Sequence, residues 1–146
     1  MKNLQSIYNS VKRFNEVAGN LDFITEESID NQISYVWEEV TETIEAFEQG
    51  DSVGMLDGCC DVFVTCAGLM QKLEAAGYDV EGALKAVCEN NMSKFLPVVS
   101  ALDKGRYDVS FNKKYKLNVL KQDGKVKKPE SFVSVQLAEF VPGDNS

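Results

Sequence analysis

The sequence predicts an all-α protein, in which a four-helix bundle-like core is followed by a short C-terminal β-hairpin and an extended tail. Apolar residues recur every three or four positions in four stretches of the first hundred residues, as they do in amphipathic helices. From Tyr107 onward the apolar residues alternate with polar ones, and the pair Asp123-Gly124 is typical of a hairpin turn. A chain of 146 residues is long enough to bury a core of its own.

Four helices are expected, at about residues 4–18, 28–49, 53–76 and 80–94. Gly19, Gly50 and Gly77 each follow one of these stretches, where a glycine suits the end of a helix. The second helix carries one apolar stripe, which we expect to face the core: Ile29, Ile33, Val36, Trp37, Val40, Ile44 and Phe47. The third helix is apolar almost all round, so we expect it to be buried on most sides.

Charge divides the chain into an acidic body and a basic segment. The net charge is −8, yet residues 1–103 carry 18 acids and 6 bases, whereas residues 104–128 carry 9 bases and 2 acids. We therefore expect a helical domain over 1–103 and a basic C-terminal extension over 104–146, with short strands packed on it. The basic segment suits phosphate groups or the acidic body of the chain itself, or is a solvated tail, and the acidic body argues against nucleic acid as a partner.

Composition excludes several kinds of chemistry. The chain has no histidine, which rules out Ser-His-Asp and Cys-His catalysis and any histidine-ligated metal. The four cysteines contain no CxxC pair, and we expect them to be small buried hydrophobes or, less often, a thiol nucleophile. No leader and no membrane span is expected, so the predicted location is the cytoplasm.

Carboxylates gather where no base can neutralise them. Glu39 and Glu42 lie three apart at the edge of the apolar stripe, and Asp57 and Asp61 lie four apart on the apolar third helix. Residues 14–71 contain neither lysine nor arginine. Buried carboxylates without a counter-charge favour a cation, and oxygen ligands suit Mg²⁺ or Mn²⁺. The alternative is an acidic face in water, which we expect for Glu45 and Glu48.

Asn91 and Lys94 share one face at the end of the fourth helix. An amide and an ammonium group near a bound cation could hold phosphate oxygens. Both residues are also ordinary at the end of a helix.

Five segments, in order along the chain, resemble motifs of the all-α nucleoside triphosphate pyrophosphohydrolase superfamily, the MazG-like and phosphoribosyl-ATP pyrophosphohydrolase-like proteins. Residues 37–42 resemble its E-E-x-x-E element, 57–62 its acidic third-helix motif, 91–95 an N-M-S-K element, 14–19 an F-H-x-x-F-G turn, and 123–129 the D-G-K-x-x-K-P tail of phage-type members. Two departures stand out. Gly58 occupies the position of a family glutamate, and Asn15 occupies that of a histidine.

The resemblance implies Mg²⁺-dependent hydrolysis of a nucleoside triphosphate to the monophosphate and pyrophosphate, in a homodimer or homotetramer. It implies that Glu39, Glu42 and Asp61 hold the metal. Either Asp57 takes over the role of the glutamate missing at position 58, as a fourth ligand, or the site has three carboxylates. It also implies that Glu38 orients or deprotonates the attacking water. Asn91, Lys94, Lys125 and Lys128 would bind the substrate's phosphates. Two alternatives stay open, namely an inactive helical oligomer, which Gly58 favours, and a nucleic-acid accessory protein that uses residues 104–128.

Overall fold

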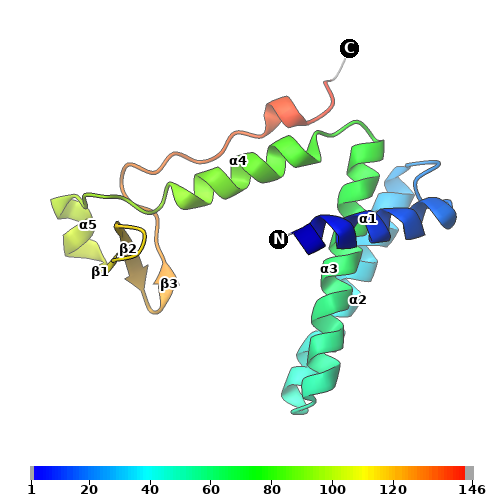
Figure 1. Cartoon of the computed structure of the whole chain (residues 1–146), viewed down its shortest axis with the longest axis horizontal. Coiled ribbons are helices and arrows are strands. Elements are labelled where there is room, and N and C mark those ends of the chain that lie inside the picture. Colours follow the sequence, from blue (N-terminus) through cyan, green and yellow to red (C-terminus); the bar gives the residue numbers. More distant parts are fainter. Residues whose placement is uncertain (1, 144–146) are drawn as a thin grey trace. The chain divides into compact units, whose positions relative to one another are not determined.

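The computed structural model describes residues 2–143, which form a mostly helical protein with a small antiparallel sheet towards the C-terminus (Figure 1). The contacts divide the chain into two compact units. The N-terminal unit extends to Val80, and the C-terminal unit spans Glu81–Gly143. Residues 1–80 carry 15 acids and 4 bases, whereas residues 81–143 carry 7 acids and 11 bases. The two units therefore have opposite net charge.

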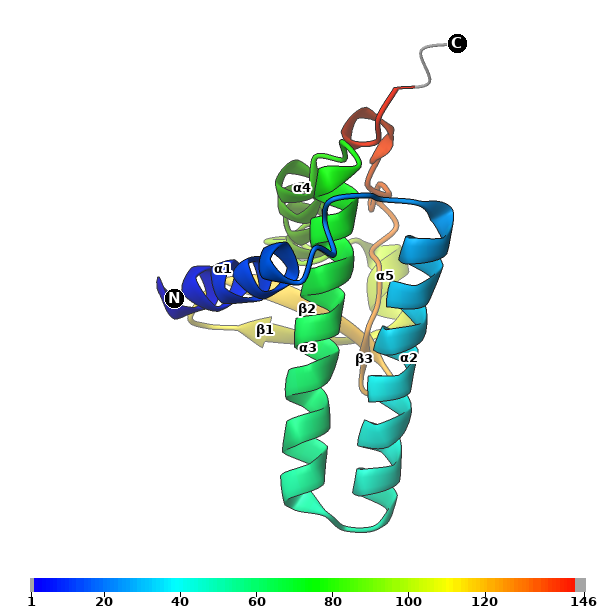
Figure 2. The same ribbon diagram turned by 90° about the vertical axis from the view of Figure 1, so that its right-hand side faces the viewer.

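The N-terminal unit is an antiparallel helical hairpin crossed by a third helix. α2 (Glu26–Glu48) and α3 (Ser52–Ala75) pack side by side along their lengths, and α1 (Lys2–Val17) lies across α3 (Figures 1 and 2). Thr25 and Ser28 form a capping box at the start of α2, and the Asp51 side chain accepts a hydrogen bond from Gly54 N at the start of α3. These caps stabilise the residues at which α2 and α3 begin.

Small residues bring α2 and α3 close together. A Cβ atom at Gly58 would lie 2.3 Å from Thr43 Oγ1, and one at Gly68 would lie 2.8 Å from Gln32 Nε2. Gln32 also donates a hydrogen bond to the main-chain oxygen of Thr65, at 2.9 Å. The contact between the helices is therefore a seam of glycine and polar side chains rather than a seam of large apolar ones.

The apolar stripe of α2 does not face α3, so the expectation that it faces the core is wrong for the single chain. Ile33, Trp37, Ile44 and Phe47 expose 50%, 69%, 50% and 71% of their surface. The reason is that α3 packs against the face of α2 that carries Gln32 and Thr43. That face lies about a quarter-turn around the helix from the apolar stripe. α3 is likewise not buried on most sides, and its exposed large apolar residues include Val53, Leu56 and Phe63.

The cysteines were expected to be buried, and this is wrong for three of them. Cys59, Cys60 and Cys88 are exposed, and Cys66 is half-buried. The seam passes through Gly58 and Gly68, so the neighbouring Cys59 and Cys60 lie beside it rather than in it. By length and composition α3 is also apolar enough to cross a membrane, which we did not expect from the sequence. Core helices of soluble proteins pass the same test.

The C-terminal unit combines helices with a three-stranded antiparallel sheet in the order β1-β2-β3. Its elements are α4 (Val80–Met92, which starts at the boundary), α5 (Ala101–Arg106), β1 (Asp108–Asn112), β2 (Leu117–Gln122), β3 (Lys125–Val126) and the 3₁₀ helix η1 (Ala138–Phe140). The predicted turn between β2 and β3 is confirmed: Asp123 and Gly124 both have positive φ, as a type I′ turn requires. Leu120 at the centre of β2 is 2% exposed.

Within the described residues, no strand follows β3. Residues 127–137 run without strand pairing, and Asn90 Nδ2 of α4 donates to the main-chain oxygen of Val133 at 2.7 Å, along the path that the tail takes beside α4 (Figure 1). The extended tail expected after the hairpin is therefore held to α4 by a hydrogen bond.

The helical core and the hairpin are confirmed, whereas the four-helix bundle is not, because α4 belongs with the sheet and leaves α1, α2 and α3 in the N-terminal unit. The compact units also differ from the expected domains 1–103 and 104–146. Asp103, 1% exposed, accepts hydrogen bonds from Glu130 N, and Asn118 N donates to Leu96 O. These bonds join residues on both sides of position 103.

Candidate functional site

The acidic residues of the hairpin meet midway along the seam between α2 and α3. Glu39 comes four residues before Thr43 on α2, and Asp61 comes three residues after Gly58 on α3. Because the main chains approach closely at Thr43 and Gly58, the next turn brings these two carboxylates near each other. Thr43 and Thr65 turn their hydroxyls back onto the helices, donating to Glu39 O at 2.7 Å and Asp61 O at 2.8 Å.

Glu39 is the most perturbed carboxyl group of this cluster. Burial raises its pKa above the ordinary value of 4.5, and the carboxylates of Glu42, Asp61 and Glu38 raise it further. Its Oε2 atom is buried and has no hydrogen-bond partner among the described residues. An unpartnered oxygen surrounded by like charges is costly unless a proton or a cation joins it.

The residues present fit a divalent cation in their chemistry. Glu39, Glu42 and Asp61 offer oxygen ligands only, which suits Mg²⁺ or Mn²⁺. The nearest base along α3, Lys72, is buried and donates to Ser28 O at 3.0 Å, so it is bound elsewhere. In the part of the chain that the structure describes, however, no three such side chains are already arranged to hold an ion. Binding would therefore require side-chain rotation.

Asp57 lies apart from the other three acids. It is exposed, and it is not one of the groups that act on Glu39. Gly58 beside it has no room for a side chain, because its Cβ would lie 3.1 Å from Thr43 Cα as well as 2.3 Å from Thr43 Oγ1. A glutamate at position 58 is thus incompatible with this packing of α2 on α3.

A cavity of about 260 Å³ adjoins the carboxylates within the N-terminal unit. Its lining comes from all three helices and from the α1–α2 connection: Val11, Phe14, Asn15, Asn20, Gln32, Tyr35, Glu38, Glu39, Val64, Thr65 and Gly68. Phe14 is 68% exposed and Tyr35 49%, so their rings remain available to a ligand. The cavity therefore combines two accessible aromatic rings with two glutamates.

Amide groups form the inner wall of this cavity. Asn15 donates to Gln71 Oε1 at 2.9 Å and accepts a hydrogen bond from Asn20 Nδ2 at 3.0 Å, while Gln71 donates to Tyr8 O at 3.1 Å. Asn15, Gln32 and Gln71 are 7%, 7% and 1% exposed. Gln32, Asn20 and Gly68 were not predicted from the sequence, although Gln32 lies two helical turns before Glu39 and so shares its face.

Two other aromatic residues of the N-terminal unit, Tyr8 and Trp37, lie outside this cavity. Tyr8 donates its hydroxyl to Glu74, and burial together with that bond raises the pKa of Tyr8. Trp37 lies on the exposed apolar stripe of α2.

The four residues expected to bind phosphate belong to the C-terminal unit. Lys94 Nζ donates to Asn91 Oδ1 at 3.1 Å, and the ammonium groups of Lys94 and Lys128 lie 5.9 and 5.3 Å from the centre of the Phe132 ring. Lys125 begins β3. Asn91, Lys94 and Lys128 therefore form one group around Phe132, separate from Lys125.

Comparison with models of protein families, with functionally characterised proteins and with solved structures finds no match for this chain. The candidate site is therefore defined by its own geometry, as an acidic helical hairpin with an adjoining amide-lined cavity.

Proposed function

We propose that the protein is a Mg²⁺-dependent nucleoside triphosphate pyrophosphohydrolase whose active site is the acidic seam between α2 and α3. The observation that carries the proposal is the buried, unpartnered Oε2 of Glu39 among the carboxylates of Glu38, Glu42 and Asp61. The resemblance of residues 37–42 and 57–62 to pyrophosphohydrolase motifs agrees with that placement.

In this proposal Glu39, Glu42 and Asp61 would hold the cation, and the exposed Asp57 would be a fourth ligand. When bound, Mg²⁺ supplies charge neutralisation and water activation at the triphosphate. Glu38 lines the cavity and accepts the proton of the water that attacks the α-phosphorus. The bond from the α-phosphorus to the bridging oxygen breaks, and pyrophosphate leaves.

The cavity beside the carboxylates would receive the base of the nucleotide. Phe14 and Tyr35 offer faces for stacking, and the amides of Asn15, Asn20 and Gln32 offer donors and acceptors for its polar edge. The resemblance assigns phosphate binding to four residues of the C-terminal unit, Asn91, Lys94, Lys125 and Lys128.

We also propose that two copies of the chain associate through the apolar stripe of α2. Ile33, Trp37, Val40, Ile44 and Phe47 are spaced alternately by four and three residues, which is the spacing of a helix–helix seam. In the single chain these residues are half-buried or exposed. If two copies joined along this stripe, their α2–α3 hairpins would together form a four-helix bundle.

Pyrophosphate release from a panel of dNTPs and NTPs tests the activity, measured with Mg²⁺ and with EDTA. We expect metal-dependent release of monophosphate and pyrophosphate, and a loss of about a hundredfold or more in Glu39→Gln, as for the removal of an electrostatic contact to the reacting groups. Glu48→Gln is the matched control, because Glu48 is exposed on the same helix.

The alternative is an inactive helical oligomer that binds nucleotides or nucleic acid. Gly58 favours it, since the position of the family glutamate cannot hold a side chain here. A wild-type chain that binds Mg²⁺ yet hydrolyses no nucleotide of the panel would replace the proposed activity with this alternative.

A further inference from the structure

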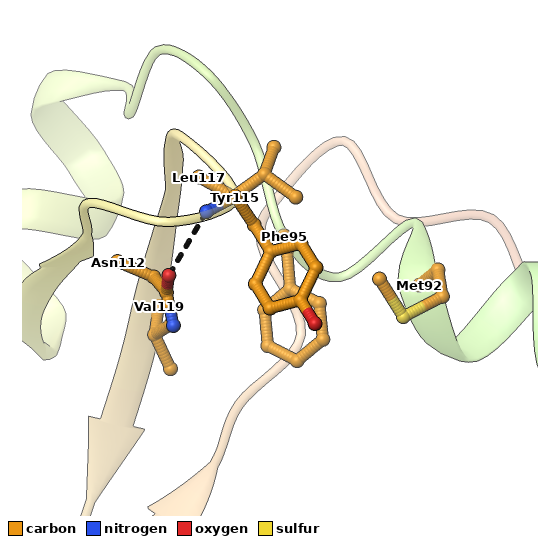
Figure 3. Close-up of a pocket in the computed structure, with 6 residues that line it drawn as sticks. All are labelled: Met92, Phe95, Asn112, Tyr115, Leu117 and Val119. Carbon is orange, nitrogen blue, oxygen red and sulfur yellow. Dashed lines mark hydrogen bonds between the residues drawn. The ribbon is translucent and has the colours of Figure 1, made fainter.

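The C-terminal unit contains a second cavity, larger than the first and different in character. It measures about 380 Å³ and lies between the end of α4 and one face of the β1–β2 hairpin. Phe95, Tyr115 and Met92 surround the hollow, with Asn112, Leu117 and Val119 at its base on the strands (Figure 3). The proposed pyrophosphohydrolase activity does not use this cavity.

The cavity is built on a defined face of the sheet. Asn112 pairs with Leu117 and Ser110 pairs with Val119, so these side chains point to the same side. Asn112 Oδ1 accepts a hydrogen bond from Tyr115 N at 3.0 Å, which holds the turn that carries the tyrosine (Figure 3). The Nδ2 group of Asn112 has no partner among the described residues, and it remains available as a donor.

Tyr115 offers an accessible ring at the mouth of this cavity. It is 64% exposed, and Lys114 Nζ lies 5.2 Å from the centre of its ring. Lys113 and Lys116 flank this pair in the β1–β2 turn. A planar aromatic ligand that carries negative charge would therefore find a stacking surface and cations at the same place.

The basic residues extend well beyond the cavity. Lys121 lies on the cavity's face of the sheet, two residues beyond Val119, and Lys125 follows the next turn. Four residues of β2, 117–120, separate Lys116 from Lys121, and the rise from one lysine to the other is about 17 Å. That length is several times the spacing of about 3.4 Å between successive phosphates along one nucleic-acid strand.

We infer that the C-terminal unit binds single-stranded nucleic acid, with an unpaired base stacked in the cavity of Phe95 and Tyr115 and the phosphates on the lysines along β2. A duplex does not fit this site, because its bases are stacked inside and cannot enter the cavity. The net charge of the whole chain argued against nucleic acid, but that charge belongs to the N-terminal unit. Residues 81–143 alone carry 11 bases against 7 acids.

Fluorescence anisotropy of a labelled oligothymidylate of about 12 nucleotides, titrated with the full chain in EDTA, tests this inference. We expect binding that weakens with salt, and an affinity about tenfold lower in Tyr115→Ala but nearly unchanged in Tyr115→Phe, because stacking needs only the ring. The slope of log affinity against log salt concentration should also change. Lys113→Gln combined with Lys114→Gln should make it shallower by about 0.7 for each phosphate that these lysines neutralise in the wild type. Lys85→Gln, an exposed lysine on α4, is the matched control.

Three results of this titration would overturn the inference. They are no binding at low salt, binding that Tyr115→Ala leaves unchanged, and equal competition by thymidine monophosphate at the same nucleotide concentration, which would assign the cavity to a mononucleotide. Preference for an acidic peptide over the oligonucleotide would also overturn it. The assay contains no Mg²⁺, and Glu39→Gln should bind normally, so the result is independent of the proposed hydrolysis.

Discussion

Gly58 determines how close α2 and α3 can come and therefore where the nearby carboxylates lie. A Cβ atom there would meet both the hydroxyl and the main chain of Thr43. The side chain of Thr43 could rotate away, but its Cα atom could not. Glu39 lies one helical turn before Thr43 on α2, and its Oε2 atom is buried.

Gly58→Ala should therefore destabilise the hairpin, by about 1–3 kcal/mol as for other overpacked sites. Gly105→Ala is the matched control, since a Cβ at Gly105 in α5 meets nothing within 4 Å. That change should be neutral or stabilising by about 0.4–1 kcal/mol. Urea unfolding of both variants measures the difference, and equal stability of the two would show that the helices separate without cost.

Glu39 should make stability depend on pH in the absence of metal. Its raised pKa means that the folded chain keeps this proton at a pH where the unfolded chain has lost it. The stabilisation is complete below the ordinary value of 4.5 and disappears as the pH rises through the raised pKa. Glu39→Gln removes the charge, so its melting temperature relative to wild type should be higher at neutral pH than in acid.

Thermal melts in EDTA, at a mildly acidic and a mildly basic pH, check this expectation. The difference in melting temperature between Glu48→Gln and wild type should be the same at the two pH values. A pH-independent difference for Glu39→Gln would mean that its carboxylate is solvated in the folded protein.

At the level of the helices, periodicity in the sequence predicted the elements well but not the direction in which they face. The four helices and the hairpin turn at Asp123-Gly124 could be predicted, because they depend on local residues. The apolar stripe of α2 was assigned to the core because apolar surface is normally buried. The structure packs the small and polar face instead, since only glycines allow the close approach seen at Gly58 and Gly68.

The candidate site shows the same limit. The cluster of Glu39, Glu42 and Asp61 could be predicted from acids without nearby bases, because an unneutralised charge is visible in the sequence. The amide wall could not, because Asn15 meets Gln71 only where α1 crosses α3, a contact 56 residues apart in sequence. α5 was also missed, because its six residues are too short to show a periodicity.

The start of α2 gives a prediction at this level. Thr25 and Ser28 cap it reciprocally, with Ser28 N donating to Thr25 Oγ1 at 3.1 Å and Thr25 N donating to Ser28 Oγ at 3.0 Å. Thr25→Ala should lower the free energy of unfolding by about 1 kcal/mol. Ser34→Ala, inside the same helix, should change it little, because the Ser34 hydroxyl only bonds back to Asp30 O. A comparable loss in both variants, measured in urea, would contradict a specific role for the cap.

For the whole molecule, the two units present different surfaces. The N-terminal unit has strong negative charge, whereas the C-terminal unit has positive charge and its own small core around Leu120. Both units expose large apolar side chains, such as Phe47 in the first and Phe111 in the second. Exposed apolar surface on this scale is typical of a chain that associates. Negative charge on the N-terminal unit favours cation binding and limits the association to faces where apolar contact outweighs repulsion.

Self-association through α2 can be tested by placing charge on the stripe. Ile44→Lys combined with Phe47→Lys should shift the chain from dimer to monomer in sedimentation equilibrium, because two lysines on each copy would have to be buried at the joined face. Both residues are half exposed or more in the single chain, so the substitutions do not disturb its own packing. Val98→Lys, at a residue 79% exposed in the C-terminal unit, should leave the association unchanged. If the double variant still forms dimers, the stripe is covered by something other than a second copy of α2, and the four-helix bundle of two chains must be abandoned.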